Sequence, residues 1–365
     1  MNDTLGLNAQ FFITKNCNLK CSYCFESTSP CSRDTLNKTD MSIETFSKAI
    51  TFIASKFNRS RFDYINVFFL GGEVLLKVNN LIEMATIVDE VASKFKIKMI
   101  KTITTNGTLL SRNTFDKLCE REIKFAISLD GEKEEHDYNR KLPSGAGSYD
   151  LIWRNGDVLK DAIDKKICTC VLMTINKKTL NNIYKNIVHL IDSGFTNIKL
   201  NFATEEMSPL LLDDNWNHIS SSLRDAFCYA KKNNVHIYPL DLVSNSIKNK
   251  TTFNQTELRC GVGSSIITVD SDGTIAPCAK FFDNNIELFT MGNALTGELK
   301  NEVFNFFTTL PKNKKLKCNS CEDQGNCVTY CPSLALKNSN LFCPPETMCK
   351  INKIIHQSLN TISEV

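Results

Sequence analysis

The chain has 365 residues, with 43 Lys and Arg against 40 Asp and Glu, and 42% of its residues are hydrophobic. The near-neutral charge does not suggest a nucleic-acid partner, no apolar run approaches the ~18 residues of a membrane span, and Met1–Thr4 lacks the features of a secretory signal. The chain is therefore expected in the cytoplasm, where its 16 cysteines indicate metal or redox centres rather than disulfides.

The first part of the chain alternates short β-rich runs with amphipathic helical patterns. Strands are predicted at 11–14, 64–70, 98–104, 123–129, 167–175 and 197–202. Helices are predicted at 42–57, 81–95, 112–122, 150–164 and 180–192, the first with Ser42 as its N-cap. Strands that each lead into a helix predict an α/β fold of parallel units. A partial six-stranded barrel is their natural closure, with reactive groups at the C-terminal ends of the strands.

The composition divides the chain into three parts. The barrel is predicted at 1–214 and a helical connector at 215–257. Beyond Glu257 the cysteine density rises, helical periodicity fades and turn residues multiply. A small cysteine-rich second domain is therefore predicted at 258–365.

Three cysteines follow the first predicted strand with the spacing Cys17-x3-Cys21-x2-Cys24. Three thiolates can hold three irons of a 4Fe–4S cube, which leaves the fourth iron open for chemistry. Zinc is the alternative, but a structural zinc site takes four protein ligands and no fourth donor lies close by. The run closely resembles the cluster loop of radical S-adenosylmethionine (radical SAM) enzymes, whose cofactor chelates the fourth iron through its amine and carboxylate.

The ends of the next strands carry further motifs of that family. Gly71-Gly72-Glu73 resembles the motif that binds the amino group of S-adenosylmethionine, with Val74 where proline is common. Two glycines would let the backbone come close to a ligand. Ser128-Leu129-Asp130-Gly131, followed by His136 and Arg140, resembles a pattern of the branch that modifies peptides. The cofactor-binding residues implied by the resemblance are Gly71, Gly72, Glu73, Asn106, Ser128, Arg140 and Leu200.

Individual roles follow from the same resemblance. Ser128 and Arg140 would hold the methionyl carboxylate or the nearby ribose, since a hydroxyl and a guanidinium suit a carboxylate. Leu200 or a neighbour would lie against the adenine. Asp130 is the candidate catalytic residue, acting on the substrate or merely shaping its turn, and His136 is expected to be a structural hydrogen-bonding group.

The cysteines of the second domain resemble the seven-cysteine SPASM domain of many radical SAM peptide-modifying enzymes. A hairpin at 269–275 would carry Cys278 back alongside Cys260. Two zinc-ribbon sites are the alternative. The resemblance implies two auxiliary 4Fe–4S clusters. The inner cluster would have one iron left open, and the outer cluster would be fully ligated. Cys343 competes with Cys349 as the last ligand of the outer cluster. The inner ligands would be Cys260, Cys278 and Cys331, and the outer ligands Cys318, Cys321, Cys327 and Cys349.

The resemblance implies an enzyme that cleaves S-adenosylmethionine reductively to a 5′-deoxyadenosyl radical and abstracts hydrogen from a ribosomally made precursor peptide. Anaerobic sulfatase maturation is one alternative, although that group has an aspartate directly after the second SPASM cysteine and here Cys278 precedes Ala279. A non-catalytic iron–sulfur or zinc scaffold is another, and the cofactor motifs argue against it.

The cofactors implied are S-adenosylmethionine and three 4Fe–4S clusters. The partners implied are the precursor peptide and an electron donor such as flavodoxin or ferredoxin. The first strand begins by about residues 7–11, which leaves no room for a leader-binding domain before it. Leader recognition is then expected from the barrel or SPASM surface or from a separate small leader-binding partner protein, and the partner is favoured because a disordered leader binds well to a dedicated surface.

Overall fold

The computed structural model describes residues 5–24, 40–176, 178–203, 216–252, 260–282, 286–309, 321–323, 326–337 and 344–360. The predictions that concern Cys318 and Cys343 lie outside these residues.

A curved sheet organises the described chain, with the strand order β13-β12-β11-β10-β1-β3-β4-β5-β7-β8-β9. The six predicted strands all form, and each pairs in parallel with its neighbour. They are β1 (Gly6–Thr14), β3 (Tyr64–Gly71), β4 (Met99–Thr105), β5 (Ile123–Ser128), β7 (Cys168–Ile175) and β8 (Asn197–Phe202). The predicted α/β barrel-like arrangement is therefore confirmed.

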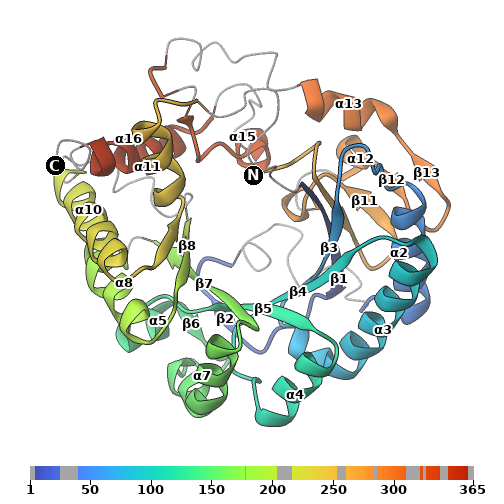
Figure 1. Cartoon of the computed structure of the whole chain (residues 1–365), viewed down its shortest axis with the longest axis horizontal. Helices are drawn as coiled ribbons and strands as arrows, with labels where there is room; N and C mark the ends of the chain where they lie inside the picture. The colour runs from blue at the N-terminus through green and yellow to red at the C-terminus, as the bar shows by residue number, and fades with distance from the viewer. Residues whose placement is uncertain are drawn as a thin grey trace.

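Helices cover the outer face of this sheet, and none of the labelled helices lies inside the ring of strands (Figure 1). The Ser42 side chain accepts a hydrogen bond from the Thr45 amide and caps the first of them, as predicted. The helix expected at 150–164 is broken into α6 and α7. The covering helices are α2 (Ile43–Ser55), α3 (Val78–Phe95), α4 (Arg112–Glu120), α6 (Tyr149–Trp153), α7 (Gly156–Asp164) and α8 (Ile183–Asp192), with short 3₁₀ turns η1 (Val74–Lys77) and η2 (Leu180–Asn182).

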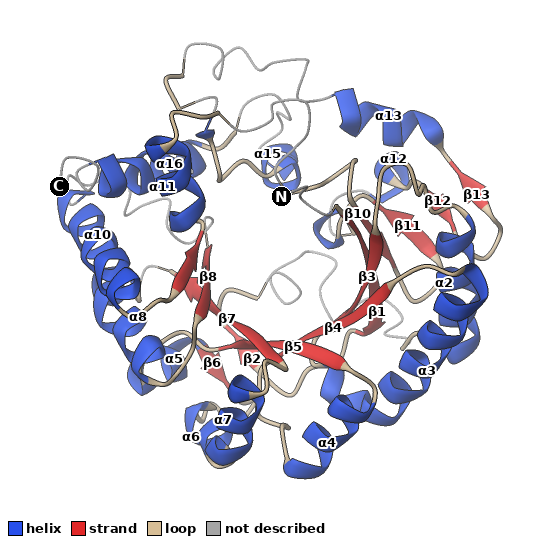
Figure 2. Ribbon diagram, in the orientation of Figure 1, coloured by secondary structure: helices blue, strands red, loops and turns tan. Residues whose placement is uncertain are grey.

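The two faces of the strands differ in chemistry because side chains alternate along a strand. Outward residues such as Phe11, Phe69 and Phe125 pack with the helices into one hydrophobic core. The inner face is more polar and more exposed. It includes Asn8, Gln10, Asn66, Thr102, Lys124 and Lys199. The strands curve around the centre of the view, with helices outside them (Figure 2).

The sheet continues beyond the six predicted strands on both sides. The connector contains α10 (Trp216–Lys232), β9 (His236–Tyr238) and α11 (Leu240–Lys248). The strand β9 was not predicted, and it pairs in parallel with β8. On the other side, β10 (Ile266–Val269) pairs in parallel with β1 and antiparallel with β11 (Thr274–Ala276), which confirms the predicted hairpin.

The C-terminal region packs directly on the barrel. Helix α16 (Glu346–Asn360) contributes Ile351, Ile354 and Ile355 to the same core as the barrel helices. The boundary predicted near residue 258 lies in 253–259, outside the described residues. The remaining elements are β12 (Gly292–Asn293), β13 (Glu298–Leu299), η4 (Ala279–Phe281), α12 (Ile286–Phe289), α13 (Asn301–Thr309) and α15 (Pro332–Lys337).

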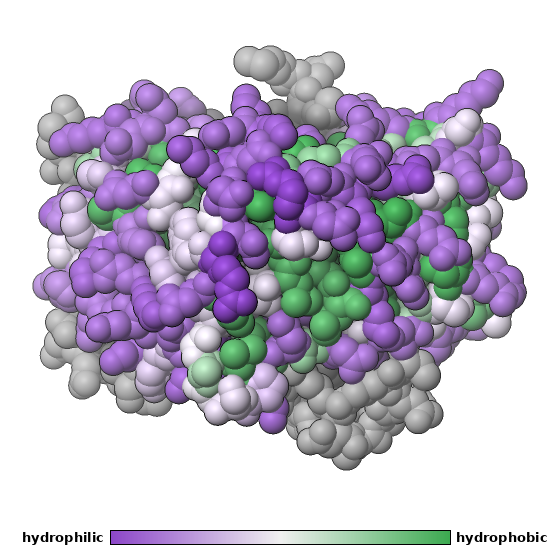
Figure 3. Space-filling view, turned by 90° about the horizontal axis from the view of Figure 1, so that it is seen from below, coloured by the Kyte–Doolittle hydropathy of each residue, from purple (hydrophilic) through white to green (hydrophobic). Residues whose placement is uncertain are grey.

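Polar and charged side chains cover most of the face seen from below, with a hydrophobic area near its centre (Figure 3). None of the helices in the described ranges combines the length and apolar character that crossing a bilayer requires.

Candidate cluster and cofactor site

The cysteine loop leaves the C-terminal end of β1, as the sequence predicts. Burial raises the pKa of the Cys21 thiol to about 11, and repulsion from Cys24 and Cys17 adds to this effect. The three thiols are therefore near neighbours. The Cys17 sulfur also accepts a hydrogen bond from the Leu19 amide at 3.4 Å. This donor set fits the thiolates of a shared iron–sulfur cluster.

In the described part of the chain, no three His, Cys, Asp or Glu side chains are close enough together to hold one metal ion. A 4Fe–4S cube does not need such a group, because each thiolate binds a different iron.

The turn after β3 lies directly against the cysteine loop. The Gly72 amide donates to the Thr14 carbonyl at 3.1 Å, and the Glu73 amide donates to the Asn16 carbonyl at 2.8 Å. A Cβ on Gly72 would lie 2.4 Å from the Asn16 oxygen, and one on Gly71 would lie 2.4 Å from the Thr14 oxygen. The two glycines thus allow a close approach to the cysteine loop, and their predicted approach to a ligand stays a prediction.

The Glu73 carboxylate is completely buried and joins two strand ends. It accepts hydrogen bonds from the Thr105 hydroxyl at 2.8 Å and from the amides of Asn106 and Leu75 at 2.7 and 3.0 Å. Burial raises its pKa, and these hydrogen bonds oppose the rise. None of the described cations forms an ion pair with it. A buried carboxylate that neutral groups alone stabilise fits a ligand that brings positive charge nearby.

The turn after β4 also contacts the cysteine loop. The Asn106 side-chain amide donates to the Asn18 side-chain oxygen at 2.9 Å, and Asn18 donates to the Thr108 hydroxyl at 2.8 Å. The Asn106 oxygen accepts in turn from the Thr108 amide at 3.0 Å. The loop that carries Cys17 is therefore held by the turns that follow β3 and β4.

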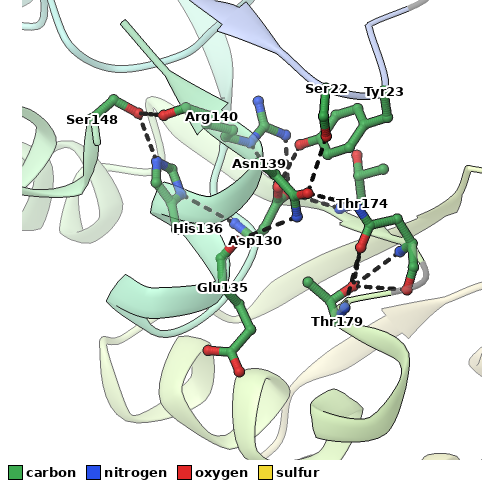
Figure 4. Close-up of polar contacts among 11 residues, drawn as sticks. Ser22, Tyr23, Asp130, Glu135, His136, Asn139, Arg140, Ser148, Thr174 and Thr179 are labelled. Atoms are coloured by element: carbon green, nitrogen blue, oxygen red, sulfur yellow. Dashed lines mark hydrogen bonds and ion pairs between the residues drawn. The ribbon is translucent and has the colours of Figure 1, made fainter. Parts of the chain in front are cut away.

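A buried ion pair supports the other end of the cysteine loop (Figure 4). Arg140 donates through Nε and Nη2 to the two oxygens of Asp130, each at 3.0 Å. The Thr174 amide donates to Asp130 at 3.0 Å, and the Tyr23 hydroxyl donates to it as well. These four donors leave Asp130 little capacity to act as a base, which favours its predicted role in shaping the turn over action on substrate.

Arg140 and Ser128 keep some capacity for a ligand. Nη1 of Arg140 and the Ser128 hydroxyl form no hydrogen bond with the described residues, and Ser128 is on the inner face of β5. Binding of the methionyl carboxylate by these two residues stays a prediction.

His136 is fully enclosed behind this pair. Its Nδ1 accepts from the Asp130 amide at 3.4 Å, so its Nε2 is free to donate to the Ser148 hydroxyl at 3.0 Å. Ser148 donates to the Arg140 carbonyl at 2.7 Å. Burial, with the Arg140 charge, lowers the pKa of His136 to about 3. The His136 imidazole is therefore neutral and links the Asp130 backbone to Ser148, which fits a structural hydrogen-bonding group.

Leu200 lies on the outer face of β8 and is only 4% exposed, within the helix-covered core. Its neighbours Lys199 and Asn201 are the residues that β8 presents on the inner face. Contact of Leu200 with adenine stays a prediction, and the alternation of the strand favours a neighbour.

The inner auxiliary cysteines also lie close to one another. Burial raises the pKa of Cys278 to about 12, with further repulsion from Cys331 and Cys260. The hairpin β10–β11 thus brings Cys278 near Cys260, as predicted. Cys278 borders a small aromatic cluster that contains Phe12, Phe281 and Phe282.

The outer auxiliary cysteines are described in part. Val328, next to Cys327, donates through its amide to the Asn352 side chain on α16 at 2.9 Å. The Thr329 hydroxyl donates to the carbonyl of Met348, the residue before Cys349, at 2.7 Å. The segment of Cys327 is therefore bound to the start of α16, where Cys349 is located. The choice of Cys349 over Cys343 stays a prediction.

The sequence did not predict which other segments of the chain bind the cysteine loop. A two-strand ladder pairs β2 (Lys20–Cys21) with β6 (Arg140–Lys141), after helix α5 (Lys133–Asn139). Lys15 forms an ion pair with Asp270 of the C-terminal hairpin at 2.8 Å. The sequence offers one local signal of these contacts, Tyr23, the aromatic residue directly before Cys24.

A model of the Radical SAM superfamily matches residues 11–187. The cysteine-type anaerobic sulfatase-maturating enzyme of Clostridium perfringens (strain ATCC 13124) is 25% identical over 172 residues, 47% of this chain and 45% of that protein. The antilisterial bacteriocin subtilosin biosynthesis protein AlbA of Bacillus subtilis is 26% identical over 294 residues, 79% of this chain and 57% of that protein. The chain thus spans about half the length of these relatives.

The solved structure of native anSMEcpe with bound AdoMet (S-adenosylmethionine) and Cp18Cys peptide has a TM-score of 0.77 and 19% identity. The match covers 98% of this chain and 99% of that chain. At this identity it shows a shared fold, which extends through the C-terminal region.

Proposed function

Because this chain belongs to the radical SAM superfamily, we propose that it holds a 4Fe–4S cluster on Cys17, Cys21 and Cys24 and modifies a ribosomally made precursor peptide. When bound, the cluster and S-adenosylmethionine supply the one-electron chemistry that yields the 5′-deoxyadenosyl radical, which removes a hydrogen atom from the peptide.

One observation carries this proposal. The loop of three neighbouring thiols follows β1 beside Glu73, a buried carboxylate that only neutral groups contact within the described ranges. A cluster needs the thiolates, and a cofactor with a sulfonium and an ammonium group supplies positive charge near the carboxylate. A non-catalytic iron–sulfur scaffold would also need the thiolates, but it would not need the buried carboxylate beside them.

The chain's own residues would orient the cofactor. Ser128 and Nη1 of Arg140 would donate to its carboxylate. The backbone of Gly71 and Gly72, on the same turn as Glu73, would face its amine. Asn106 would keep the loop of Cys17 in place through Asn18.

Two auxiliary 4Fe–4S clusters are part of the proposal, which makes three in all. Cys260, Cys278 and Cys331 would hold the inner one, with one iron open. The outer one would be held by Cys318, Cys321, Cys327 and Cys349. These clusters would accept an electron from the product radical or bind a substrate sulfur.

A peptide substrate is supported by the two kinds of relative, one from the biosynthesis of the bacteriocin subtilosin and one whose structure holds a peptide. Sulfatase maturation is the second candidate, which the match to anSMEcpe over nearly its whole length favours. Against it, Cys278 is followed by Ala279 in the turn η4 rather than by an aspartate.

A flavodoxin or ferredoxin donor and a separate leader-binding protein are proposed as further partners. A cytoplasmic location stays a prediction.

The test is anaerobic reconstitution followed by incubation with dithionite and S-adenosylmethionine. Release of 5′-deoxyadenosine is expected. Parallel reactions with a precursor peptide encoded beside this protein and with a sulfatase-derived cysteine peptide distinguish the two substrates by mass change. If iron binds but no 5′-deoxyadenosine forms, the chain is an iron–sulfur scaffold and the proposal is wrong.

A further inference from the structure

The ion pair of Asp130 and Arg140 is buried directly against the cysteine loop. Asp130 is completely buried and Arg140 is 6% exposed. The backbone of Arg140 pairs with that of Cys21 in the ladder of β2 and β6. A buried ion pair is weak evidence for stability, because desolvation offsets much of the attraction. Its position beside a cluster ligand therefore suggests a functional use.

The Tyr23 side chain also links this ion pair to the cysteine loop. It stands between Cys21 and Cys24, its hydroxyl donates to Asp130, and the Arg140 guanidinium lies 5.4 Å from the centre of its ring. Ser22 adds a backbone hydrogen bond to the Asn139 carbonyl at 2.9 Å. The loop segment is thus bound to the pair through both main chain and side chain (Figure 4).

We infer that Asp130 is a positioning and charge-compensating residue, which cancels the Arg140 charge beside the N-terminal cluster and so keeps the reduction potential of that cluster low. This inference rests on the proposed function.

The electrostatic argument is direct. Reduction adds an electron to a cluster whose thiolates are already anionic, and a nearby cation stabilises the reduced form. Arg140 alone would therefore make the cluster easier to reduce and a weaker reductant toward S-adenosylmethionine. The Arg140 backbone pairs with Cys21, and Asp130 forms a bidentate ion pair with Arg140, so the two opposite charges lie together beside a cluster ligand.

The measurement is the midpoint potential of the N-terminal cluster in the reconstituted full chain, followed by electron paramagnetic resonance in a redox titration. In the wild type, the signal that changes when S-adenosylmethionine is added identifies this cluster among the three, and the midpoint of that same signal is then compared in all variants without the cofactor. Asp130→Asn keeps the shape and an acceptor but removes the charge, and it is expected to shift the midpoint to more positive values. Arg140→Gln is expected to shift it to more negative values. The double variant is expected to return near the wild type.

Two controls separate charge from mechanical support. Tyr23→Phe removes the hydroxyl donor without changing a charge, so its midpoint is expected to match the wild type. Asp161→Asn breaks the surface ion pair of Asp161 with Arg112, which joins the outer helices α7 and α4. This variant should also leave the midpoint unchanged. A purely structural role for Asp130 would not predict opposite shifts in the two single variants.

Two results would overturn the inference: an unchanged or more negative midpoint in Asp130→Asn, or a double variant that keeps the shift. If Asp130→Asn fails to hold the cluster, iron content decides. The double variant, which carries no unpaired buried charge, must then regain iron, and its failure to do so also overturns the inference. A wild-type chain without any signal that responds to S-adenosylmethionine contradicts the proposed function instead.

Discussion

The carbonyl oxygen of Asn16 lies 2.4 Å from the place that a Cβ would occupy on Gly72. The Cβ of Cys17 lies 2.8 Å from the same point. This contact fixes the turn after β3 against the first residues of the cysteine loop. The turn and the cluster loop therefore act as one unit.

Gly72→Ala should displace the cysteine loop, because backbone atoms on the other side of the contact cannot rotate away. We expect the reconstituted variant to lose about one cluster's four irons while the auxiliary clusters remain. Gly156→Ala is the matched control, since its Cβ would meet only the Trp153 side chain at 3.3 Å. Equal iron content in all three proteins would show that the contact is not needed.

Glu73→Gln should weaken binding of S-adenosylmethionine more than it disturbs the fold. Glutamine keeps an acceptor for the Asn106 amide but removes the buried negative charge. A loss of about 1.5–3 kcal/mol in binding free energy is expected for a charged interaction. Equilibrium binding to the anaerobic protein measures it, with the exposed Glu83→Gln as control. Unchanged affinity with intact clusters would remove Glu73 from the cofactor site.

His136 predicts how the stability of the cluster-free protein depends on pH. Its folded-state pKa of about 3 lies below its ordinary value of 6.5. The unfolded chain therefore binds the proton first, and the free energy of unfolding falls as the pH drops from about 6.5 toward about 3. One such group contributes a slope of up to about 1.4 kcal/mol per pH unit.

Urea unfolding of the cluster-free protein at several pH values measures this slope. His136→Gln removes the titrating group, so a shallower pH dependence is expected, together with lower stability at neutral pH. His236→Gln is the control, because His236 is exposed. The same slope in wild type and His136→Gln would contradict a depressed pKa for His136.

The inner auxiliary site gives a separate prediction. Replacing Cys260, Cys278 and Cys331 with alanine should remove about four irons. The N-terminal site does not use these residues, so release of 5′-deoxyadenosine should continue while peptide modification stops. A structure of the wild type with four cysteine sulfurs on the inner cluster would contradict the predicted open iron.

The sequence predicts the barrel well because its signals are local. The six parallel strands form where β-rich runs were found, and Ser42 caps its helix, since periodicity and capping are properties of neighbouring residues. The strand β9 was missed because three residues carry too little pattern. The continuity of the sheet through β10 was missed because pairing with β1 joins residues far apart in the chain.

The candidate site was predicted in its composition but not in its connections. The cysteines Cys17, Cys21 and Cys24 are brought together as the spacing suggests. The partnership of Asp130 and Arg140 is a tertiary contact, and no spacing distinguishes it from two separate ligand contacts. The side of β8 on which Leu200 lies depends on which face of the strand the helices cover, which the motif alone does not give.

The most direct test of the whole account is the replacement of Cys17, Cys21 and Cys24 together by alanine. We predict the loss of about four irons out of about twelve and the complete loss of 5′-deoxyadenosine release. A chain that keeps its full iron content, or that still releases 5′-deoxyadenosine without these cysteines, would contradict the assignment of the catalytic cluster to this loop.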